Sequence, residues 1–570
     1  MKDFKWWQKA VFYQIYPRSF CDSNGDGIGD LQGIVSRLDY LQDLGVDAIW
    51  LSPHYPSPQV DFGYDVSNYK AIAQEYGDMA DFQQLLNGLH QREMRLILDL
   101  VLNHTSDQHS WFQASRSSRG DPKRDWYIWR DGKNGGPPNN WNSIFGGSAW
   151  EYDPTSDQYY YHFFFKQQPD LNWRNPQVKQ AMWDVVRFWL DMGVDGFRLD
   201  AIGTIFEDEK LPDHQCPKTL EQVYYEQRIA ATPEEMKRTD IQWKAMFESQ
   251  VNQPDLHELL QELRSLVDEY PGERVLVGES EDIAYCGDGT NELHMVFNFP
   301  LMQTHHLTPE WVRSNQETRL AALPVKAWPC NTLGNHDTPR VFSQYGDGEH
   351  DEQIARISLA LVLTLKGTPF LYYGEEIGMT NFLLKRIDQV LDPLGKWIYQ
   401  MVMDLLGAAP EEALDYAVRF SRDQCRTPMQ WSNAPNAGFS PAGVQTWLPA
   451  NPNYAQGNNV EEQLSNPGSL LQYYRNLLRV RRQNSALITG DFKLLHKEEQ
   501  DYLAFLRRNE SQTCLVILNM SDRSHTIGFD PGKKSAKPIF SSHDRKTLID
   551  DLSSLPIAPY EIYIAKLGIE

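Results

Sequence analysis

Three acidic residues, each placed just after a short apolar run, are the first candidates for chemistry. Asp200 lies in GFRLDA, Glu279 ends RVLVGE, and Asp337 follows NTLGNH. Residues two apart on a strand point to the same face, so Arg198 projects beside Asp200 and can hold that carboxylate ionised. A single carboxylate after a strand is more often a helix cap or part of a structural ion pair. Three of them, each beside His, Arg or Gly, favour a catalytic site.

Several carboxylates around one pocket suit metal catalysis, activation of a carbonyl substrate, or cleavage of a glycosidic bond. Metal catalysis would need His and Asp at ligand spacing, and the chain has no HExxH motif. Glycosidic cleavage needs one ionised and one protonated carboxyl group, and sugar rings stack on flat apolar faces. Aromatic residues that could supply such faces, although each is equally compatible with a core position, are Trp126, Trp129, Trp141, Phe145 and Trp150.

The elements that must position these acids are predicted from apolar runs that alternate with helical patterns. Eight candidate strands are 11–17, 47–53, 95–104, 196–201, 274–279, 294–300, 331–336 and 369–376. Helical periodicity lies between several of them, for example over 34–45, 79–94, 180–193 and 256–270. Strand and helix in alternation indicate a parallel α/β sheet, and eight such units predict a (β/α)8 TIM barrel with its functional groups at the carboxyl ends of the strands.

Two internal intervals and the C-terminal region do not follow this alternation of strands and helices. Residues 105–171, rich in Trp, Tyr, Gly and Asn, predict a lid subdomain inserted after the third strand, and about 377–432 form a second insertion. From 492 to 570 short alternating strands predict a C-terminal all-β sandwich domain. The barrel domain would then comprise residues 1–104 and 172–491.

Composition limits the partners. The chain has 570 residues and a formal net charge of −23, which disfavours nucleic acid and anionic membranes. No run of about 18 apolar residues and no signal peptide is visible, so we expect no membrane association. The six cysteines lack metal spacing and indicate a reducing compartment, which predicts a cytoplasmic protein. A small neutral or cationic ligand suits this charge better.

Many ordered motifs resemble those of glycoside hydrolase family 13, the α-amylase clan, on its oligo-1,6-glucosidase and α-glucosidase branch. They run from near the first residue to about 432 and comprise VFYQIYPRSF, GYD (63–65), DLVLNH (99–104), QPDLNW (168–173), GFRLDA (196–201), GE (278–279), GNHD (334–337), YYGEEIGM (372–379) and RDQCRTPMQW (422–431). A chance match to so many motifs in family order is implausible.

The resemblance implies roles for the three acids. Asp200 would be the nucleophile, Glu279 the general acid and base, and Asp337 the acid that holds sugar hydroxyls. The implied reaction is a double displacement with retention, with the two reacting carboxyl groups about 5 to 5.5 Å apart. Arg198 would keep Asp200 ionised, and poor solvation would raise the pKa of Glu279 so that it keeps its proton.

The resemblance also implies substrate contacts. His104 and His336 would hydrogen-bond the glucose in the cleavage subsite, and Tyr64 would stack on it. Asp65 and Arg422 would form the pair that closes the pocket at the non-reducing end. Residues implied at the aglycone side or beside the nucleophile are Phe145, Arg198 and Ala201. A residue smaller than valine at 201 goes with α-1,4 or broader preference, so the implied activity is exo-acting α-glucosidase on maltose-like or sucrose-like substrates over α-1,6 ones.

Alternatives stay open at this stage. A transglucosylase or a sucrose or maltose isomerase would use the same three acids and the same glucosyl-enzyme. Hydrolysis of a phosphorylated disaccharide is less favoured, because no cationic cluster reserved for phosphate is evident in the sequence. A non-catalytic binding relative would have lost catalytic acids, which are all present here. The chain could be a monomer or a homodimer.

A separate pattern concerns a metal. In DSNGDGIGD (22–30) the spacing imitates the first nine positions of an EF-hand loop, but the glutamate of position twelve is replaced by glycine. An ordinary Asp/Asn/Gly turn has the same composition. The family resemblance implies a structural Ca²⁺, with Mg²⁺ as the alternative, held by Asp22, Asn24, Asp26, the Ile28 carbonyl and Asp30.

Overall fold

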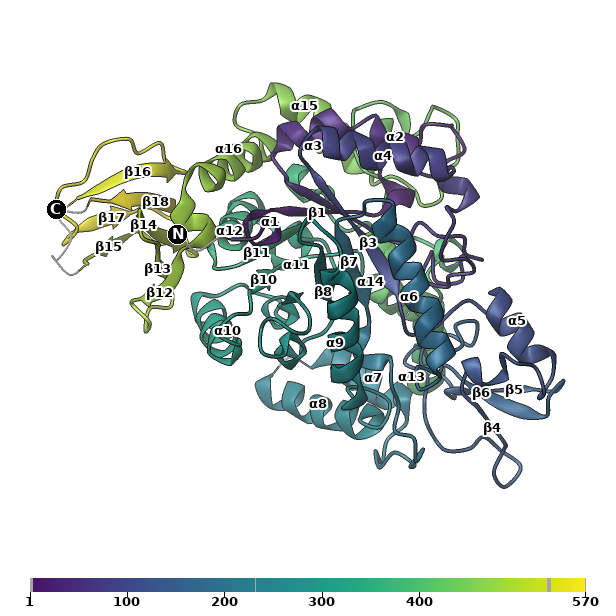
Figure 1. Ribbon diagram of the computed structural model, residues 1–570. Coiled ribbons are helices and arrows are strands. Elements are labelled where there is room, and N and C mark those ends of the chain that lie inside the picture. Colours follow the sequence, from purple (N-terminus) through teal and green to yellow (C-terminus); the bar gives the residue numbers. More distant parts are fainter. Residues whose placement is uncertain (1–3, 231, 530–534, 569–570) are drawn as a thin grey trace.

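A computed structural model describes residues 4–230, 232–529 and 535–568. Its centre is a sheet of eight parallel strands, and each of the eight predicted strands is present in it (Figure 1). The strands are β1 (Phe12–Ile15), β2 (Ala48–Leu51), β3 (Arg95–Val101), β7 (Gly196–Asp200), β8 (Val275–Gly278), β9 (Met295–Val296), β10 (Cys330–Asn331) and β11 (Thr368–Tyr372). The predicted TIM barrel is thus confirmed.

The barrel is nearly closed. The strand order is β10-β11-β1-β2-β3-β7-β8-β9, so β9 and β10 face each other at a seam. Side chains bridge this seam: the Asn298 amide donates to the Asn331 side chain at 3.0 Å, and the Cys330 thiol donates to the Val296 carbonyl at 3.3 Å. These contacts replace missing backbone pairing and hold the two shortest strands in place.

The helices cover the outside of the barrel because each has one apolar stripe. In α6 (Pro176–Asp191), Asn175 caps the first turn, and Val178, Met182, Val186 and Trp189 at helical spacing are buried. The other helices of the barrel and its flanks are α1 (Trp6–Lys9), α2 (Leu31–Val35), α3 (Leu38–Leu44), α4 (Met79–Gln91), α9 (Asp255–Asp268), α10 (Pro309–Ala322), α11 (Val341–Tyr345), α12 (Asp351–Thr364), α15 (Val460–Ser465), α16 (Leu470–Gln483) and α17 (Ser485–Thr489).

The interval after β3 contains a small three-stranded sheet and one helix. Its strands are β4 (Trp129–Arg130), β5 (Trp150–Asp153) and β6 (Gln158–Tyr161), in the order β4-β6-β5, and the helix is α5 (Ser110–Ser117). Figure 1 shows these elements at the end of the molecule opposite the C-terminal strands. Its tryptophans at 126, 129, 141 and 150 are all buried: the first two belong to the main core, and the last two pack in a cluster with apolar residues of α7 and α8.

Two helical hairpins stand over the carboxyl ends of the barrel strands. One is formed by α7 (Leu220–Ile229) and α8 (Pro233–Phe247) after β7, and the other by α13 (Pro393–Leu406) and α14 (Pro410–Phe420) after β11. They meet through aromatic contacts, since Tyr224 of α7 packs edge-on against Trp397 of α13 with ring centroids 5.1 Å apart. The insertion after β11 is therefore a folded part of the rim of the barrel.

The C-terminal part is an antiparallel β structure, as predicted. Five strands have the order β12-β13-β14-β18-β16, and β15 pairs with β17. These strands are β12 (Asp491–Leu495), β13 (Tyr502–Arg508), β14 (Thr513–Asn519), β15 (His525–Ile527), β16 (Ala536–Ser541), β17 (Leu555–Ile557) and β18 (Ile562–Leu567). Buried Arg507 of β13 joins this sheet to the barrel by donating to the carbonyl of Leu365, which lies just beyond the end of α12.

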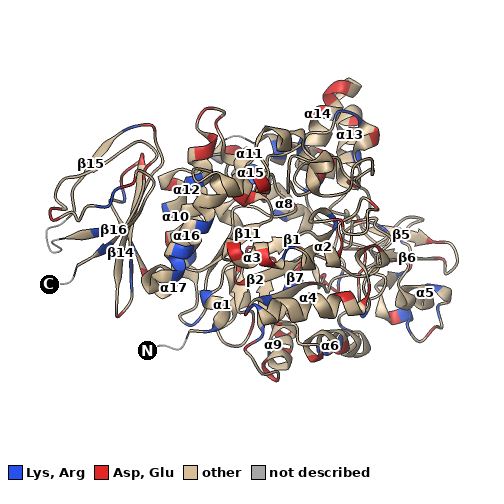
Figure 2. Cartoon of the chain, turned by 90° about the horizontal axis from the view of Figure 1, so that it is seen from above, with Lys and Arg blue, Asp and Glu red and all other residues tan. Residues whose placement is uncertain are grey.

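Charge is unevenly distributed over the surface. Figure 2 shows acidic positions on α3 and basic positions on α16, whose last turn carries Arg481 and Arg482. Within the described ranges no helix has the length and apolarity needed to cross a membrane.

Candidate active site

The three predicted acids lie around one cavity at the carboxyl ends of the barrel strands. Asp200, Glu279 and Asp337 all line a cavity of about 1360 Å³, together with Tyr64 and His104. Asp200 is the last residue of β7, Glu279 directly follows β8, and Asp337 follows β10. Because parallel strands end on the same side of a barrel, residues from distant parts of the sequence meet at one mouth.

Arg198 is the centre of the acidic cluster. Its Nη1 lies 2.6 Å from one oxygen of Asp200 and 2.6 Å from one oxygen of Asp99, and its Nη2 lies 2.7 Å from Glu279 Oε2. The guanidinium is 1% exposed. The expected pair of Arg198 and Asp200 is present, but the same arginine also binds two further carboxylates.

The sharing of Arg198 among three carboxylates affects the pKa of Asp200 and of Asp99. Burial raises the pKa of Asp200, Arg198 opposes that rise, and the charges of Glu279 and Asp99 add to it. Burial likewise raises the pKa of Asp99 to about 6. One positive charge cannot balance three carboxylates in a poorly solvated site, so the cluster retains a proton near neutral pH. Arg198 therefore does not act on Asp200 alone, and the raised pKa expected for Glu279 stays a prediction.

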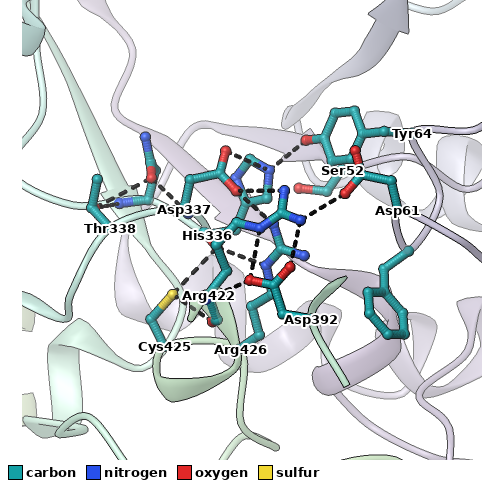
Figure 3. A network of polar contacts seen from close by, with 12 residues as sticks. Ser52, Asp61, Tyr64, His336, Asp337, Thr338, Asp392, Arg422, Cys425 and Arg426 are labelled. Carbon is teal, nitrogen blue, oxygen red and sulfur yellow. Dashed lines mark hydrogen bonds and ion pairs between the residues drawn. The ribbon is translucent and has the colours of Figure 1, made fainter. Parts of the chain in front are cut away.

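Asp337 has the opposite environment. Arg426 donates to its Oδ1 at 2.5 Å, and His336 Nε2 lies 3.3 Å from its Oδ2 (Figure 3). Burial would raise the pKa of Asp337, but the positive charges of Arg426 and Arg422 outweigh it and lower the pKa overall. Asp337 is thus ionised while Asp200 and its neighbours share a proton. An ionised carboxylate at this place suits the expected role of holding sugar hydroxyls.

His336 and Tyr64 form a hydrogen-bonded chain behind the cavity. The Gln14 amide donates to His336 Nδ1 at 2.8 Å, which leaves Nε2 to donate to the Tyr64 hydroxyl. Tyr64 in turn donates to Asp99 Oδ2 at 3.0 Å, and its ring stacks on the His336 ring with centroids 5.5 Å apart. Burial lowers the pKa of His336 well below its usual value, so the ring is neutral.

His104 is the second buried histidine of the site. Its Nε2 lies 3.1 Å from the Tyr64 carbonyl and 3.0 Å from the Gln168 amide, and its Nδ1 lies 3.2 Å from the Asn103 amide. Burial lowers the pKa of His104 to about 3. A neutral imidazole that lines the cavity can donate to or accept from a sugar hydroxyl.

The ion pair that Arg422 forms in the cavity differs from the sequence prediction. Arg422 Nη2 lies 2.8 Å from Asp61 Oδ1 and 2.8 Å from Asp392 Oδ1 (Figure 3). Asp61 and Arg422 line the cavity, and Asp65 does not. The prediction that Asp65 is the partner of Arg422 is therefore wrong.

Asp65 organises the loop that presents Asp61. Its carboxylate accepts from the Ser57 hydroxyl at 2.7 Å and from the backbone amides of Val60 and Asp61 at 2.9 and 3.0 Å. All of its oxygens thus point back into residues 57–65. Asp61 follows an ordinary hydrophobic residue in SPQVDFGYD and carries no local signal; only its spacing to Tyr64 could have indicated it.

Ala201 connects Asp200 to Glu279 through its backbone. Its φ angle is +40°, in the left-handed region that residues with a side chain rarely occupy. This turn directs its N–H to Glu279 Oε2 at 2.8 Å. Glu279 Oε2 therefore accepts from both Ala201 and Arg198, which leaves Oε1 as the oxygen able to carry a proton.

Aromatic residues line the cavity, but they are not the predicted tryptophans. Phe145 lines it, stacked on Phe165 at 4.4 Å and placed 5.5 Å from the Arg422 guanidinium. The four tryptophans at 126, 129, 141 and 150 are buried. Phe163 and Phe164 take the cavity positions instead.

The DSNGDGIGD loop lies apart from these residues. Asp22 accepts from the Gly25 and Gly27 amides at 2.7 and 2.9 Å, and Asp30 caps α2. Within the described residues none of Asp22, Asp26 and Asp30 has an ion pair with Lys or Arg, and no three His, Cys, Asp or Glu side chains form a metal-binding group. The loop thus has a tight turn with free negative charge, and the remaining ligands would be the Asn24 side chain and the Ile28 carbonyl.

Comparisons with known proteins agree with this geometry. Residues 14–490 match the model of the α-amylase catalytic domain family. An oligo-1,6-glucosidase of Parageobacillus thermoglucosidasius is 39% identical over 99% of both chains, and a probable α-glucosidase of Rhizobium meliloti is 41% identical over 92% of this chain and 91% of its own. The crystal structure of the trehalulose synthase MutB from Pseudomonas mesoacidophila MX-45 superposes with a TM-score of 0.88 at 37% identity, covering 99% of this chain and 100% of MutB. The barrel, the strand-end carboxylates and these full-length relatives together show that the chain is a glycoside hydrolase and belongs to the α-amylase family, glycoside hydrolase family 13, in its glucosidase branch.

Proposed function

We propose that this α-glucosidase is a retaining, exo-acting enzyme that removes the non-reducing terminal α-glucosyl residue from short oligosaccharides, with α-1,4 or sucrose-type linkages preferred over α-1,6. The observation that carries the proposal is the cavity that holds Asp200 and Glu279 and is closed at one end by the ion pair between Asp61 and Arg422. A cavity closed at one end accepts a chain terminus and rejects internal sugars.

In the first step Asp200 attacks the anomeric carbon. One of its oxygens is held by Arg198, so the other is the nucleophilic one. The bond from the anomeric carbon to the leaving oxygen breaks, and a glucosyl ester forms. Glu279 donates its proton from Oε1 to the leaving oxygen, because Oε2 already accepts from Ala201 and Arg198.

In the second step Glu279, now ionised, takes a proton from water, which attacks the anomeric carbon. The bond from this carbon to the Asp200 oxygen breaks, so that α-glucose and the Asp200 carboxylate are released and Glu279 is protonated again. Asp337 binds sugar hydroxyls as an ionised acceptor throughout, since its pKa is lowered. The charge that develops on the flattened ring strengthens this contact in the transition state.

The linkage preference is proposed from Ala201. Its side chain lines the cavity beside Glu279, and its small size leaves room for the C6 hydroxymethyl group and ring of an α-1,4-linked aglycone. A similar protein is named an oligo-1,6-glucosidase, so a measured preference for α-1,4 over α-1,6 linkages would distinguish this chain from what that name implies.

The test is product analysis by NMR with maltose, isomaltose, sucrose, trehalose and maltotriose. We expect α-glucose to appear first, from maltose or sucrose, while isomaltose reacts slowly. First appearance of β-glucose would exclude retention. Isomaltose as the best substrate would refute the linkage preference but not the mechanism.

Transfer of glucose to a sugar is the second candidate. Phe145, Phe164, Trp243, Phe247 and Phe420 line the cavity, and such apolar walls stack a sugar acceptor and exclude water. MutB, a trehalulose synthase of similar structure, favours this candidate. New disaccharides as the main product from concentrated sucrose or maltose would establish it, and free glucose as the main product would exclude it. The retained acids argue against a function limited to sugar binding.

We further propose that the 22–30 loop binds a structural Ca²⁺ through Asp22, Asn24, Asp26, Asp30 and the Ile28 carbonyl. A bound divalent cation would balance two of the three negative charges of these carboxylates, which have no basic partner among the described residues. Adding CaCl₂ to chelator-treated protein should raise Tm, and Asp26→Ala should abolish that rise. An equal rise in wild type and D26A would place the ion elsewhere.

A further inference from the structure

One wall of the cavity, formed by α7, α8 and the end of α14, has an unexpected charge. This outer wall comprises Arg228, Lys244, Phe247, Glu248, Arg419 and Phe420, all of which line the cavity. It has three cations and one carboxylate, in a chain whose formal net charge is −23. We place the leaving group along this wall, because the proposed position of the glucosyl ring is beside Asp61 and Arg422.

Arg228 is held in place without an acidic partner. Its Nη2 donates to the Tyr224 hydroxyl at 3.0 Å, and its guanidinium lies 5.0 Å from the Tyr224 ring and 5.4 Å from the Phe420 ring. The side chain is therefore fixed between α7 and α14. Within the described residues it forms no ion pair, so its remaining N–H groups are free for a ligand.

Lys244 and Arg419 extend the positive wall. Lys244 of α8 is exposed and has no ion pair within the residues that the structure describes. Arg419 of α14 pairs only with Asp415 on the same helix at 2.8 Å, and both side chains are more than half exposed. Such an exposed pair is weak, so a ligand anion can compete for Arg419.

The acidic residues in the first turn of α14 do not line the cavity. Figure 2 shows acidic positions at the outer end of α14, where Glu411 and Glu412 form the first turn. The basic residue of its last turn, Arg419, faces the cavity with Arg228 and Lys244. Cations collected on one wall of an acidic protein attract an anion to that wall.

We propose that the preferred substrates are α-glucosides whose aglycone carries a negative charge, a carboxylate or a phosphate, which is bound by Arg228 and Lys244 with support from Arg419. This inference rests on the proposed glucosidase function and specifies its aglycone. Aromatic Phe247 and Phe420 would contact the carbon skeleton of the same aglycone while the cations bind its charged end.

The test uses pairs of substrates that differ only in charge. Maltobionate and maltitol share an open-chain aglycone that ends in a carboxylate or a hydroxymethyl group. Maltose phosphorylated at O6 of its reducing-end glucose and maltose itself form the phosphate pair. We expect kcat/KM to favour the anionic member of at least one pair by about fivefold or more at low salt, and the favoured pair identifies the anion. The preference should shrink as NaCl is raised from about 0.02 to about 0.5 M.

Variants test whether Arg228 and Lys244 cause the preference for anionic substrates. Arg228→Gln and Lys244→Gln should each reduce the ratio of anionic to neutral kcat/KM, and the double variant should reduce it further. Lys237→Gln is the matched control, because Lys237 lies on the same helix α8 but does not line the cavity. The proposal is overturned if neutral substrates are equally good or better in both pairs, or if R228Q and K244Q keep the wild-type ratio.

Calorimetry with Asp200→Asn separates this proposal from the glucosidase function. It measures the binding of maltobionate and maltitol without turnover. Tighter binding of maltobionate would support the anionic wall even if no substrate were hydrolysed, which would refute the glucosidase function alone. Equal binding of the two ligands together with hydrolysis of maltitol would overturn the anionic wall alone.

Discussion

Arg422 donates from Nη2 to Asp61 at 2.8 Å, although 361 positions separate the two residues in the chain. The same guanidinium binds Asp392, 30 positions earlier in the same insertion, so the loop after β2 and the insertion after β11 meet at the cavity. The contact is buried, and removing one partner would leave an uncompensated charge in a poorly solvated place.

Asp61→Asn should therefore open the closed end. We expect KM for maltose or sucrose to rise by at least about tenfold, while activity on longer oligosaccharides falls less. Steady-state kinetics over maltose to maltopentaose measures this. Asp388→Asn is the control, because its pair with Arg386 is exposed. An unchanged KM profile in D61N would show that the pair does not bound the subsite.

Asp200→Asn tests the nucleophile. An amide cannot form the glucosyl ester, so kcat should fall by about ten-thousand-fold or more on every substrate. Circular dichroism and Tm would check that the fold is kept. Full turnover in D200N would disprove the assigned mechanism.

Glu279→Gln should have a selective effect. Because the lost group would protonate the leaving oxygen, kcat/KM for maltose should fall strongly. The kcat/KM for a 2,4-dinitrophenyl α-glucoside, whose leaving group needs no proton, should fall much less. The ratio of the two kcat/KM values relative to wild type measures this. Equal losses on both substrates would exclude the role of general acid.

The arrangement of three carboxylates around Arg198 predicts the pH dependence. Asp99→Asn removes one negative neighbour of Asp200, and this lowers the pKa of Asp200. The acidic limb of the kcat/KM profile should therefore move to lower pH, by about half to one unit. A shift to higher pH, or no shift, would show that Asp99 does not share the proton.

Substitutions of Ala201 should affect both backbone strain and the preference between α-1,4 and α-1,6 linkages. Its φ of +40° suits glycine and opposes β-branched residues, so Ala201→Gly should keep or raise Tm, and Ala201→Val should cost about 1–2 kcal/mol of unfolding free energy. Val would also reduce the space beside the aglycone and should raise the ratio of isomaltose to maltose turnover. Thermal unfolding and the two kcat/KM values test the two effects separately.

Stability should depend on pH through buried carboxyls. Burial raises the pKa of Asp65, Asp99 and Asp423 to about 6 each, against about 3.9 in the unfolded chain. Between these values the native state binds more protons, so the free energy of unfolding rises as pH falls from 7 to about 5. Below about pH 4 the lowered pKa of Asp337 reverses the trend, because its stabilising charge is then lost. A Tm that increases steadily from pH 5 to 8 would contradict this.

Much of the site was readable from the sequence because the chemistry lies at strand ends. Asp200, Glu279 and Asp337 each follow a recognisable apolar run, and the eight runs predict the barrel that brings them together. Asp65 was mistaken for Asp61 because both are acidic residues of one short loop. Only the fold shows that Asp65 turns back to bind the amides of that loop, while Asp61 faces Arg422.

The sequence by itself predicted the barrel from the alternation of apolar runs and helical patterns. It predicted the family from ordered motifs that resemble those of its members, and that resemblance implies the roles of the three acids. The tertiary structure decided how one arginine is divided among three carboxylates, which aromatic side chains reach the cavity, and where three surface cations converge. Those properties depend on distances between residues far apart in the chain, such as Arg228 of α7 and Phe420 of α14. Local patterns do not contain these distances, because they are set by the packing of the two hairpins over the barrel.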